Sequence, residues 1–165
     1  IPYGLLYITE HAKWNTDYMP PSGLKGKRIL DVGAGCGESA MWLLNQGARQ
    51  VLCVENNVEA RVYLKRNARL NKGVSALMGS FNPGEHLWRH VDLIKMDIEG
   101  YEVLFADWLD DHPYFNVDCV VEVHSVYQKD RFLKLGFSER VDPIFGGDPP
   151  WGLYSSARLM YRWKR

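Results

Sequence analysis

Short apolar runs alternate with helical patterns from Lys27 onward, and this alternation constrains the fold more than any other feature of the chain. The apolar runs predict buried strands at residues 28–32, 51–54, 74–78, 91–96 and 117–123. The helical patterns cover residues 38–46, 58–70, 101–109 and 127–135. Strands that alternate with helices form a mostly parallel sheet covered by helices on both faces. In the second helix, we expect Val58, Val62 and Leu70 to form the apolar side.

The last part of the chain departs from this alternation. Residues 137–144 and 155–163 read as two strands, and the loop between them, residues 145–152, has no helical pattern. Two consecutive strands without a crossover helix pair antiparallel. The sequence therefore predicts a three-layer α/β fold, with a mostly parallel seven-stranded sheet and an antiparallel last strand.

The length of 165 residues fits a single domain of ordinary size. We expect this domain to cover residues 27–165. Residues 1–26 are irregular and rich in aromatic side chains, and they close with a turn at residues 20–23. We expect them to form a lead-in segment that covers the substrate site.

The charge balance excludes a protein that binds nucleic acid through a basic field over its whole surface. Lys and Arg number 20, Asp and Glu number 20, and the formal net charge is zero. A local basic patch is possible at the C-terminus, for which an exposed, solvated strand is the simpler explanation. The residues of that patch are Arg158, Arg162, Lys164 and Arg165.

Neither a membrane span nor a disulfide framework is visible in the sequence. No apolar run approaches the length that crosses a bilayer, and no signal-peptide pattern opens the chain. The three cysteines, Cys36, Cys53 and Cys119, have no CxxC spacing. We therefore expect a reduced, cytoplasmic setting without a membrane partner.

A glycine-rich loop follows the first strand and opens the first helix. It contains Gly33, Ala34, Gly35 and Gly37, directly after Asp31. Glycines let the chain turn sharply and let a ligand approach the backbone. The free N–H groups at the helix start favour an anionic group such as a carboxylate.

The spacing of this loop discriminates between cofactors. A dinucleotide fingerprint is GxGxxG, whereas Glu38 stands where the third glycine would fall. An acidic side chain at the helix start also repels a pyrophosphate. S-adenosylmethionine has no phosphate and fits better, and a nicotinamide enzyme is a distant alternative.

Two acidic residues close neighbouring strands of the predicted sheet. Glu55 ends the second strand, where a carboxylate can accept both ribose hydroxyls of a nucleoside. Asp97 ends the fourth strand, beside the point where the strand order should reverse. Open α/β sheets bind ligands at that point. The glycine loop, Glu55 and Asp97 together therefore predict a cofactor site.

With these residues the sequence resembles the class I S-adenosylmethionine-dependent methyltransferases from Lys27 to Arg165. More narrowly, the string from Asp92 to Glu102 resembles the signature of the FkbM family, as do Glu122-Val123-His124 and Leu135-Gly136-Phe137. The resemblance implies a Rossmann-like methyltransferase fold. It also implies O-methylation of a hydroxyl on a small molecule or sugar. Asn56 and Asn57 follow Glu55 where the family commonly has a proline.

The resemblance assigns cofactor-binding roles by position. The backbone of the glycine loop would contact the methionine end, and Asp31 would order the loop and reach the amino group through water. Glu55 would bind the ribose with Asn56 beside it. Ser80 and Phe81 follow the third strand, where the class places adenine. Asp97 would lie under the methionine moiety, close to the reacting centre.

An alcohol needs a base or a metal to become a nucleophile, because its own pKa lies far above 7. We predict Asp97, Glu99 and His124 as catalytic residues, with Glu122 as a further candidate base. His124 is attractive because the ordinary pKa of histidine is about 6.5, although a structural, hydrogen-bonded histidine explains it equally well. These four residues could also gather a divalent cation, but no spacing demands one, and we expect no metal.

Two alternatives stay open for function. One keeps the cofactor and makes RNA the acceptor, through the basic C-terminal strand. The other is a non-catalytic subunit that uses the fold for interaction. Asp148-Pro149-Pro150-Trp151 resembles a motif of amino-group methyltransferases, but it lies between the last two strands and we interpret it as a proline-stiffened loop. Trp14 and Trp151 are candidate walls of the substrate pocket.

Overall fold

The computed structural model describes residues 19–140 and 158–162, and the structural statements below concern these residues. The strands are β1 (Arg28–Val32), β2 (Gln50–Glu55), β3 (Val74–Met78), β4 (Leu93–Met96), β5 (Asp118–Val123), β6 (Ser138–Arg140) and β7 (Arg158–Arg162). The helices are α2 (Glu38–Asn45), α3 (Val58–Leu70), α4 (Glu102–Asp110) and α5 (Val126–Lys134), with short 3-10 turns η1 (Pro83–Glu85) and η2 (Leu87–His90).

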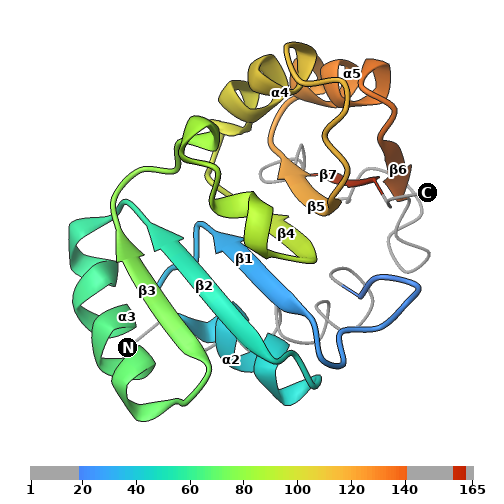
Figure 1. The fold of residues 1–165 in the computed structure, drawn as a ribbon. Coiled ribbons are helices and arrows are strands. Elements are labelled where there is room, and N and C mark those ends of the chain that lie inside the picture. The colour runs from blue at the N-terminus through green and yellow to red at the C-terminus, as the bar shows by residue number, and fades with distance from the viewer. Residues whose placement is uncertain (1–18, 141–157, 163–165) are drawn as a thin grey trace, which may run out of the picture.

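The strands form one seven-stranded sheet in the order β3-β2-β1-β4-β5-β7-β6 (Figure 1). The first five strands in this order pair parallel, and β7 pairs antiparallel with both β5 and β6. The predicted three-layer α/β fold and its antiparallel last strand are therefore confirmed. The residues that connect β6 to β7, 141–157, lie outside the described part of the chain.

Each face of the sheet has its own helices and core. On one face, Leu43 of α2 and Leu64 of α3 pack with Ile29 and Val51 of the sheet. The other face carries the aromatic core, in which Phe105 of α4 and Phe132 of α5 pack with strand residues. β1, β2, β4 and β5 are largely buried on both faces, which explains their continuous apolar runs, whereas β3 at the edge of the sheet is partly exposed.

The strand order places the predicted site residues at one edge of the sheet. β1 lies between β2 and β4, so the order reverses between β1 and β4. Parallel strands all end at the same edge, so the loop after β1, Glu55 at the end of β2 and Asp97 after β4 meet there. This is the position at which open α/β sheets bind ligands.

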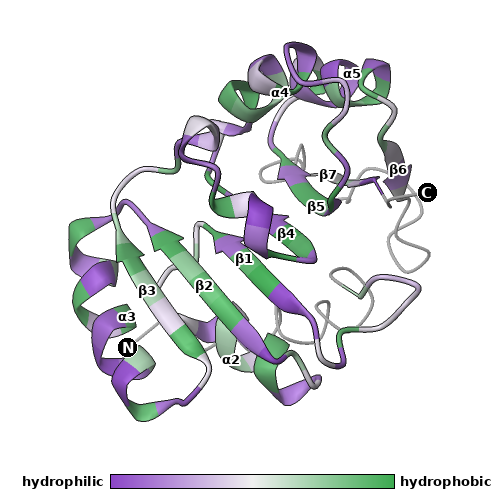
Figure 2. Ribbon diagram, viewed as in Figure 1, coloured by the Kyte–Doolittle hydropathy of each residue, from purple (hydrophilic) through white to green (hydrophobic). Residues whose placement is uncertain are grey.

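The prediction of which residues form the apolar side of α3 is wrong. Val58, Val62 and Leu70 are exposed, and only Leu64 is buried in this helix. The physical reason is the position of α3 beside β3, an edge strand that offers the helix only a narrow area to cover. Figure 2 shows the consequence, with hydrophilic and hydrophobic residues alternating along the outside of α3.

The segment between β3 and β4 holds structure that the sequence analysis missed. η1 and η2 occupy the place of a third crossover helix, and Trp88 of η2 donates a hydrogen bond to the carbonyl of Pro83 (3.1 Å). The Trp88 ring contacts the rings of Trp108 and Phe115. The fourth strand begins at Leu93, two residues after the predicted start. Apolar spacing could not reveal η1 and η2 because each is only about one turn long.

The C-terminal strands pair antiparallel as predicted, over the described residues Ser138–Arg140 and Arg158–Arg162. The predicted ends of the hairpin, the loop 145–152 with its Asp-Pro-Pro-Trp string, and Trp14 lie outside the described residues. Lys164 and Arg165 of the basic C-terminal patch lie outside them as well. The side chain of Arg162 does not face water freely, since it donates a hydrogen bond to the carbonyl of Phe115 and lies over the Phe115 ring.

The turn predicted at residues 20–23 is present, with the Gly23 N–H bonded to the Pro20 carbonyl (2.8 Å). Residues 1–18 lie outside the described part, so the division into a lead-in segment and a domain at Lys27 stays a prediction. None of the described helices combines the length and the apolar character that a bilayer crossing requires.

Candidate active site

The glycine loop turns where β1 meets the end of β4. Gly33 has a φ of 77°, and a Cβ atom at this position would overlap the backbone carbonyl oxygen of Asp97. Its N–H donates to the carbonyl of Val54 (2.9 Å), which ties the loop to β2. Gly37, with a φ of 99°, opens α2. Only glycine meets both demands at position 33, a left-handed backbone and close contact with a neighbouring strand.

Glu55 connects the end of β2 to this loop. Its side chain is buried, and its two carboxylate oxygens accept hydrogen bonds from the N–H groups of Gly35 (2.7 Å) and Asn57 (2.6 Å). A carboxylate oxygen has two lone pairs, so each retains capacity for one more donor. Beside it, the exposed Asn56 side chain accepts a hydrogen bond from Arg61 (3.0 Å). Glu55 therefore orders the glycine loop and offers acceptors at its mouth.

Asp31 lies beneath the loop, in a buried ion pair. Lys95, its neighbour on β4, places Nζ 3.2 Å from Asp31 Oδ1 and donates to the Gly33 carbonyl (3.3 Å). Ser39 at the start of α2 donates to the second Asp31 oxygen. Burial lowers the pKa of Lys95, but Asp31, Asp97 and Glu122 more than offset this effect and the pKa is raised. Asp31 is thus linked to the glycine loop through Lys95, and its carboxylate is occupied by Lys95 and Ser39.

The loop between β4 and α4 is folded around Glu102. Both oxygens of this fully buried carboxylate accept backbone hydrogen bonds, from Ile98 (2.8 Å) and Gly100 (2.9 Å). The loop is tight, with a left-handed backbone at Glu99 (φ 55°) and Gly100 (φ 105°). A left-handed non-glycine residue is strained, and such strain concentrates at functional sites.

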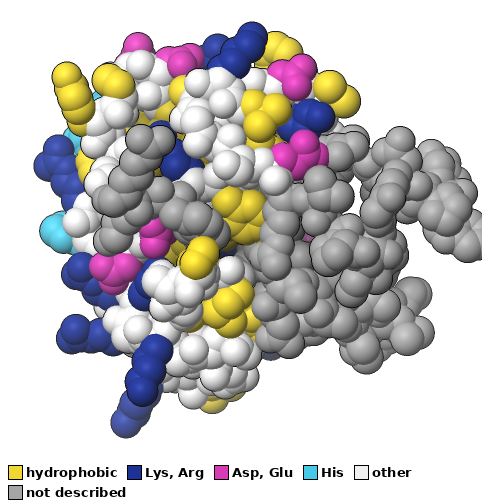
Figure 3. Space-filling model, turned by 90° about the vertical axis from the view of Figure 1, so that its right-hand side faces the viewer, with side chains coloured by type: hydrophobic (Ala, Val, Ile, Leu, Met, Phe, Trp, Pro, Cys, Tyr) yellow, Lys and Arg dark blue, Asp and Glu magenta, His cyan; other side chains and the backbone are white. Residues whose placement is uncertain are grey.

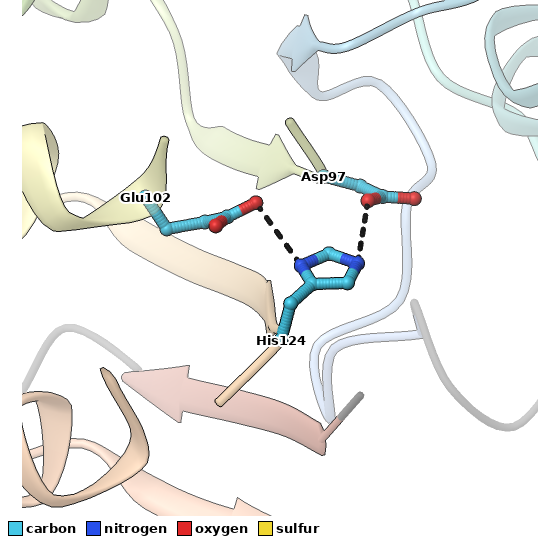
Figure 4. Close-up of side chains that lie close together, drawn as sticks. All are labelled: Asp97, Glu102 and His124. Atoms are coloured by element: carbon cyan, nitrogen blue, oxygen red, sulfur yellow. Dashed lines mark ion pairs between the residues drawn. The ribbon is translucent and has the colours of Figure 1, made fainter. Parts of the chain in front are cut away.

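His124 lies at the end of β5, between the carboxylates of this loop (Figure 4). Its Nδ1 is 3.4 Å from Glu102 Oε1, and its Nε2 is 3.6 Å from Asp97 Oδ1. Glu99, whose side chain is 85% exposed, places Oε2 3.5 Å from the same Nε2. The structure therefore brings together the three predicted catalytic residues, Asp97, Glu99 and His124.

A buried glutamine joins this loop to the one after β5. Gln128 of α5 donates hydrogen bonds to the Gly100 carbonyl (2.7 Å) and to the Glu102 carboxylate (3.2 Å). Its side-chain carbonyl accepts a hydrogen bond from the backbone N–H of His124 (2.8 Å). Its place in the network fixes His124 relative to the β4–α4 loop. Gln128, Glu102 and Lys95 were not among the predicted site residues. Lys95 and Glu102 both stand in the FkbM-like string and could have been found there, whereas Gln128 gave no signal on its own.

The electrostatics of His124 differ from the sequence expectation. The hydrogen bond to Glu102 raises the pKa of His124 to about 9, against a smaller lowering by burial, with Asp97 and Glu99 adding to the rise. The pKa of Glu102 is lowered, because contacts with His124 and the Ile98 N–H outweigh its burial. The expectation that the pKa of His124 lies near 6.5 is therefore wrong. At neutral pH this imidazole is an imidazolium and cannot accept a proton.

The raised pKa of His124 predicts how the free energy of unfolding depends on pH. Because the folded pKa of about 9 exceeds the ordinary value of 6.5, the protonated histidine stabilises the fold fully below pH 6.5. That contribution is lost as the pH rises through 9. A histidine NMR titration, assigned with His124→Gln, should report a midpoint near 9, and the free energy of unfolding should fall between pH 6.5 and 9 in the wild type only. A midpoint near 6.5 would contradict the ion-pair arrangement.

Asp97, Glu102 and His124 also have ligand atoms within 4.8 Å of one another, a separation that suits a metal ion. Glu102 is already committed to backbone N–H groups and His124 to carboxylates. Glu122, the fourth predicted candidate, contributes instead to the field around Lys95. His124 and the carboxylates around it form an imidazolium–carboxylate network.

The predicted adenine residues lie after β3, at the edge next to Glu55. Gly79 donates to the Glu55 carbonyl (3.1 Å) and so starts the turn that carries Ser80 and Phe81. Ser80 is exposed, and Phe81 is half-buried with its ring edge against Phe105 (6.0 Å between centroids). Ser80 and Phe81 thus lie beyond β2 from the glycine loop, on the same edge of the sheet.

Comparison with known proteins gives distant relatives by sequence. No protein-family model matches the chain. Protein arginine N-methyltransferase 6 from Xenopus tropicalis is 30% identical over 118 residues, which cover 70% of this chain. The chain spans only 30% of the length of that relative.

Solved structures are similar over most of the chain. An S-adenosylmethionine dependent methyltransferase from Mesorhizobium loti is similar over 91% of this chain and 96% of its own, with a TM-score of 0.58 and 15% identity. Fibrillarin from Aeropyrum pernix, solved with natively bound S-adenosyl-L-methionine, is similar over 83% and 66%, with a TM-score of 0.58 and 18% identity. These similarities establish a Rossmann-like methyltransferase fold for this chain.

Proposed function

We propose that this chain is an S-adenosylmethionine-dependent methyltransferase that acts on a hydroxyl group. The observation that carries the proposal is the meeting of Gly33, Glu55 and Asp97 at the edge of the sheet where the strand order reverses. The fold, which the chain shares with S-adenosylmethionine-dependent enzymes, supports the same choice of cofactor. The non-catalytic alternative is disfavoured because the glycine loop and both acidic strand ends are in place.

The residues at this edge fit the cofactor. The backbone at Gly33 packs directly against Asp97, whereas a Cβ atom at Gly35 would meet only Glu38 Oε2, at 3.6 Å. Backbone N–H groups at the start of α2 suit a carboxylate, and the remaining lone pairs of Glu55 suit ribose hydroxyls. When bound, the cofactor would supply an electrophilic methyl carbon on its sulfonium.

We assign Asp97 as the residue that contacts the acceptor hydroxyl. Its side chain is 28% exposed, so it reaches both the interior of the site and solvent. Asp97 would orient the acceptor hydroxyl in line with the methyl carbon and take its proton. His124, as an imidazolium, would donate toward Asp97 and orient that carboxylate. Glu99 is less suited to accept the proton of the hydroxyl, because water surrounds most of its side chain.

The resemblance supports an FkbM-like relationship and a hydroxyl on a small molecule or sugar as the acceptor, and the sparse cysteines support a cytoplasmic location. The carboxylates around His124 outnumber its single positive charge, which suits an acceptor group that donates a hydrogen bond. The relative with 30% identity acts, by its name, on arginine. Methylation of a nitrogen is therefore the outcome to test beside the hydroxyl.

The direct test is calorimetric titration with S-adenosylhomocysteine. We expect the wild type to bind with a Kd of about 1–100 μM. Absence of binding by folded protein would refute the proposed function. Methyl transfer from radiolabelled cofactor to a panel of sugars, phenols and guanidines then identifies the acceptor class.

Asp97→Asn separates chemistry from cofactor binding. We expect kcat to fall by about 100- to 10,000-fold because the proton acceptor is lost, while the Kd for S-adenosylhomocysteine changes only a few-fold. Asp92→Asn is the matched control, since Asp92 lies at the opposite end of β4 and bonds to Arg28. Equal kcat values for the two variants would show that Asp97 does not accept the proton.

A further inference from the structure

The helix α3 concentrates positive charge in a chain whose net charge is zero. Residues 58–72 contain one acidic residue, Glu59, against several basic residues. The basic residues are Arg61, Lys65, Arg66, Arg69 and Lys72. On the described part of the face in Figure 3, by contrast, basic and acidic side chains are interspersed. The positive charge of α3 is therefore a local feature.

Most of these cations are available to a partner. Lys65, Arg66, Arg69 and Lys72 are exposed, and none forms an ion pair within residues 19–140 and 158–162. Arg131 on α5 is different, because it pairs with Asp107 and Asp110. Arg61 is also different, since it bonds to the Glu55 carbonyl (2.8 Å) and to Asn56. Exposed cations without partners attract a polyanion over a distance of about 10 Å.

Exposed apolar side chains lie among these cations. Val62 is 51% exposed, Tyr63 is 55% exposed and Leu70 is 81% exposed. Because successive helix residues are about 100° apart, Val62, Arg66, Arg69 and Leu70 share an arc of roughly 100°. A helix that inserts into a membrane surface separates its apolar and cationic faces, and α3 mixes them. An aromatic ring among cations is instead typical of surfaces that bind single-stranded nucleic acid.

The cation-bearing surface starts at Lys65, about 10 Å along α3 from the end of the helix that lies beside the candidate active site. α3 begins at Val58, directly after the Glu55–Asn57 segment at the mouth of the glycine loop. β2 and β4 are separated only by β1, so Glu55 and Asp97 lie about two strand spacings apart, roughly 10 Å. A strand bound along α3 can therefore continue across the sheet edge to Asp97.

We propose that the outward face of α3 binds the backbone of single-stranded RNA. The face consists of Lys65, Arg66, Arg69 and Lys72, with Tyr63 placed to stack on a base. This inference rests on the proposed function, since an RNA strand carries the sugar hydroxyl that the site would methylate. It also differs from the predicted RNA contact at the C-terminal strand, where Arg162 is engaged with Phe115.

Fluorescence anisotropy with a labelled oligouridylate of about 20 nucleotides tests the surface without cofactor. We expect a plot of log affinity against log salt to have a slope near −3, about 0.7 for each of four cations. Arg66→Gln with Arg69→Gln should weaken binding at least tenfold and reduce the slope by about 1.5. Tyr63→Ala should weaken binding about tenfold without changing the slope. The matched control, Arg131→Gln with Lys134→Gln, removes two charges from α5 and should leave affinity unchanged.

The outcomes separate this proposal from the proposed function. Weak RNA binding by the α3 double variant, with unchanged binding of S-adenosylhomocysteine, supports the surface. Equal RNA binding by the α3 variant and the α5 control overturns it, as does capture of the wild type by phosphatidylserine vesicles without RNA binding. If the wild type does not bind S-adenosylhomocysteine, only the proposed methyltransferase function is refuted. The RNA-binding surface is tested separately, because the anisotropy is measured without cofactor.

Discussion

Gly33→Ala should abolish binding of S-adenosylhomocysteine and lower the free energy of unfolding by about 3 kcal/mol or more. The added methyl group would overlap the backbone carbonyl of Asp97. Neither partner can move easily, because the Asp97 N–H is bonded to the Val32 carbonyl (3.0 Å) and β1 pairs with β4 along its length. The loop would have to leave the sheet edge, and the cofactor site would lose its shape.

Gly26→Ala is the matched control for this variant. Gly26 has a φ of 76°, against 77° for Gly33, but a Cβ atom at Gly26 meets no atom within 4 Å. Both alanines therefore carry the same left-handed backbone cost, about 1–2 kcal/mol. Only Gly33→Ala adds the overlap with Asp97. Chemical denaturation and calorimetric titration of both variants isolate that overlap, and equal losses of stability would mean that the loop does not pack on β4 as described.

Glu55→Gln should weaken binding of S-adenosylhomocysteine by about 100-fold. The Glu55 carboxylate accepts two backbone N–H groups, and an amide side chain can accept at only one end. The NH2 group of the glutamine would face either Gly35 or Asn57, donor against donor. Loss of a charge-assisted hydrogen bond, with a buried donor left unpaired, costs about 2–3 kcal/mol. The ribose hydroxyls would also lose their charged acceptor.

Glu59→Gln removes the same charge from an exposed position in the first turn of α3. We expect its affinity for S-adenosylhomocysteine to stay within twofold of the wild type. Thermal melting of both variants shows whether Glu55→Gln remains folded at the temperature of the titration. Similar affinities for the two folded variants would exclude Glu55 from the cofactor site.

Much of the fold could be predicted from local patterns. Residues 74–78 and 58–70 coincide with β3 and α3, because strand and helix periods are properties of neighbouring residues. The GxGxG spacing and the acidic residues at two strand ends also located the candidate site. The apolar side of α3 could not be predicted, since its exposure depends on the position of β3 at the edge of the sheet.

The sequence by itself determined the alternation of strands and helices, the glycine that the turn at position 33 requires, and the acidic residues that end β2 and follow β4. Only the tertiary structure decided the charge state of His124, the pairing of Asp31 with Lys95 and the role of Gln128. These depend on groups far apart in the chain, such as Gly100 and Gln128, which are brought within 2.7 Å. A pKa follows from the charges and burial around a group, and those are set by packing between elements, whereas a strand or helix period is set within one element.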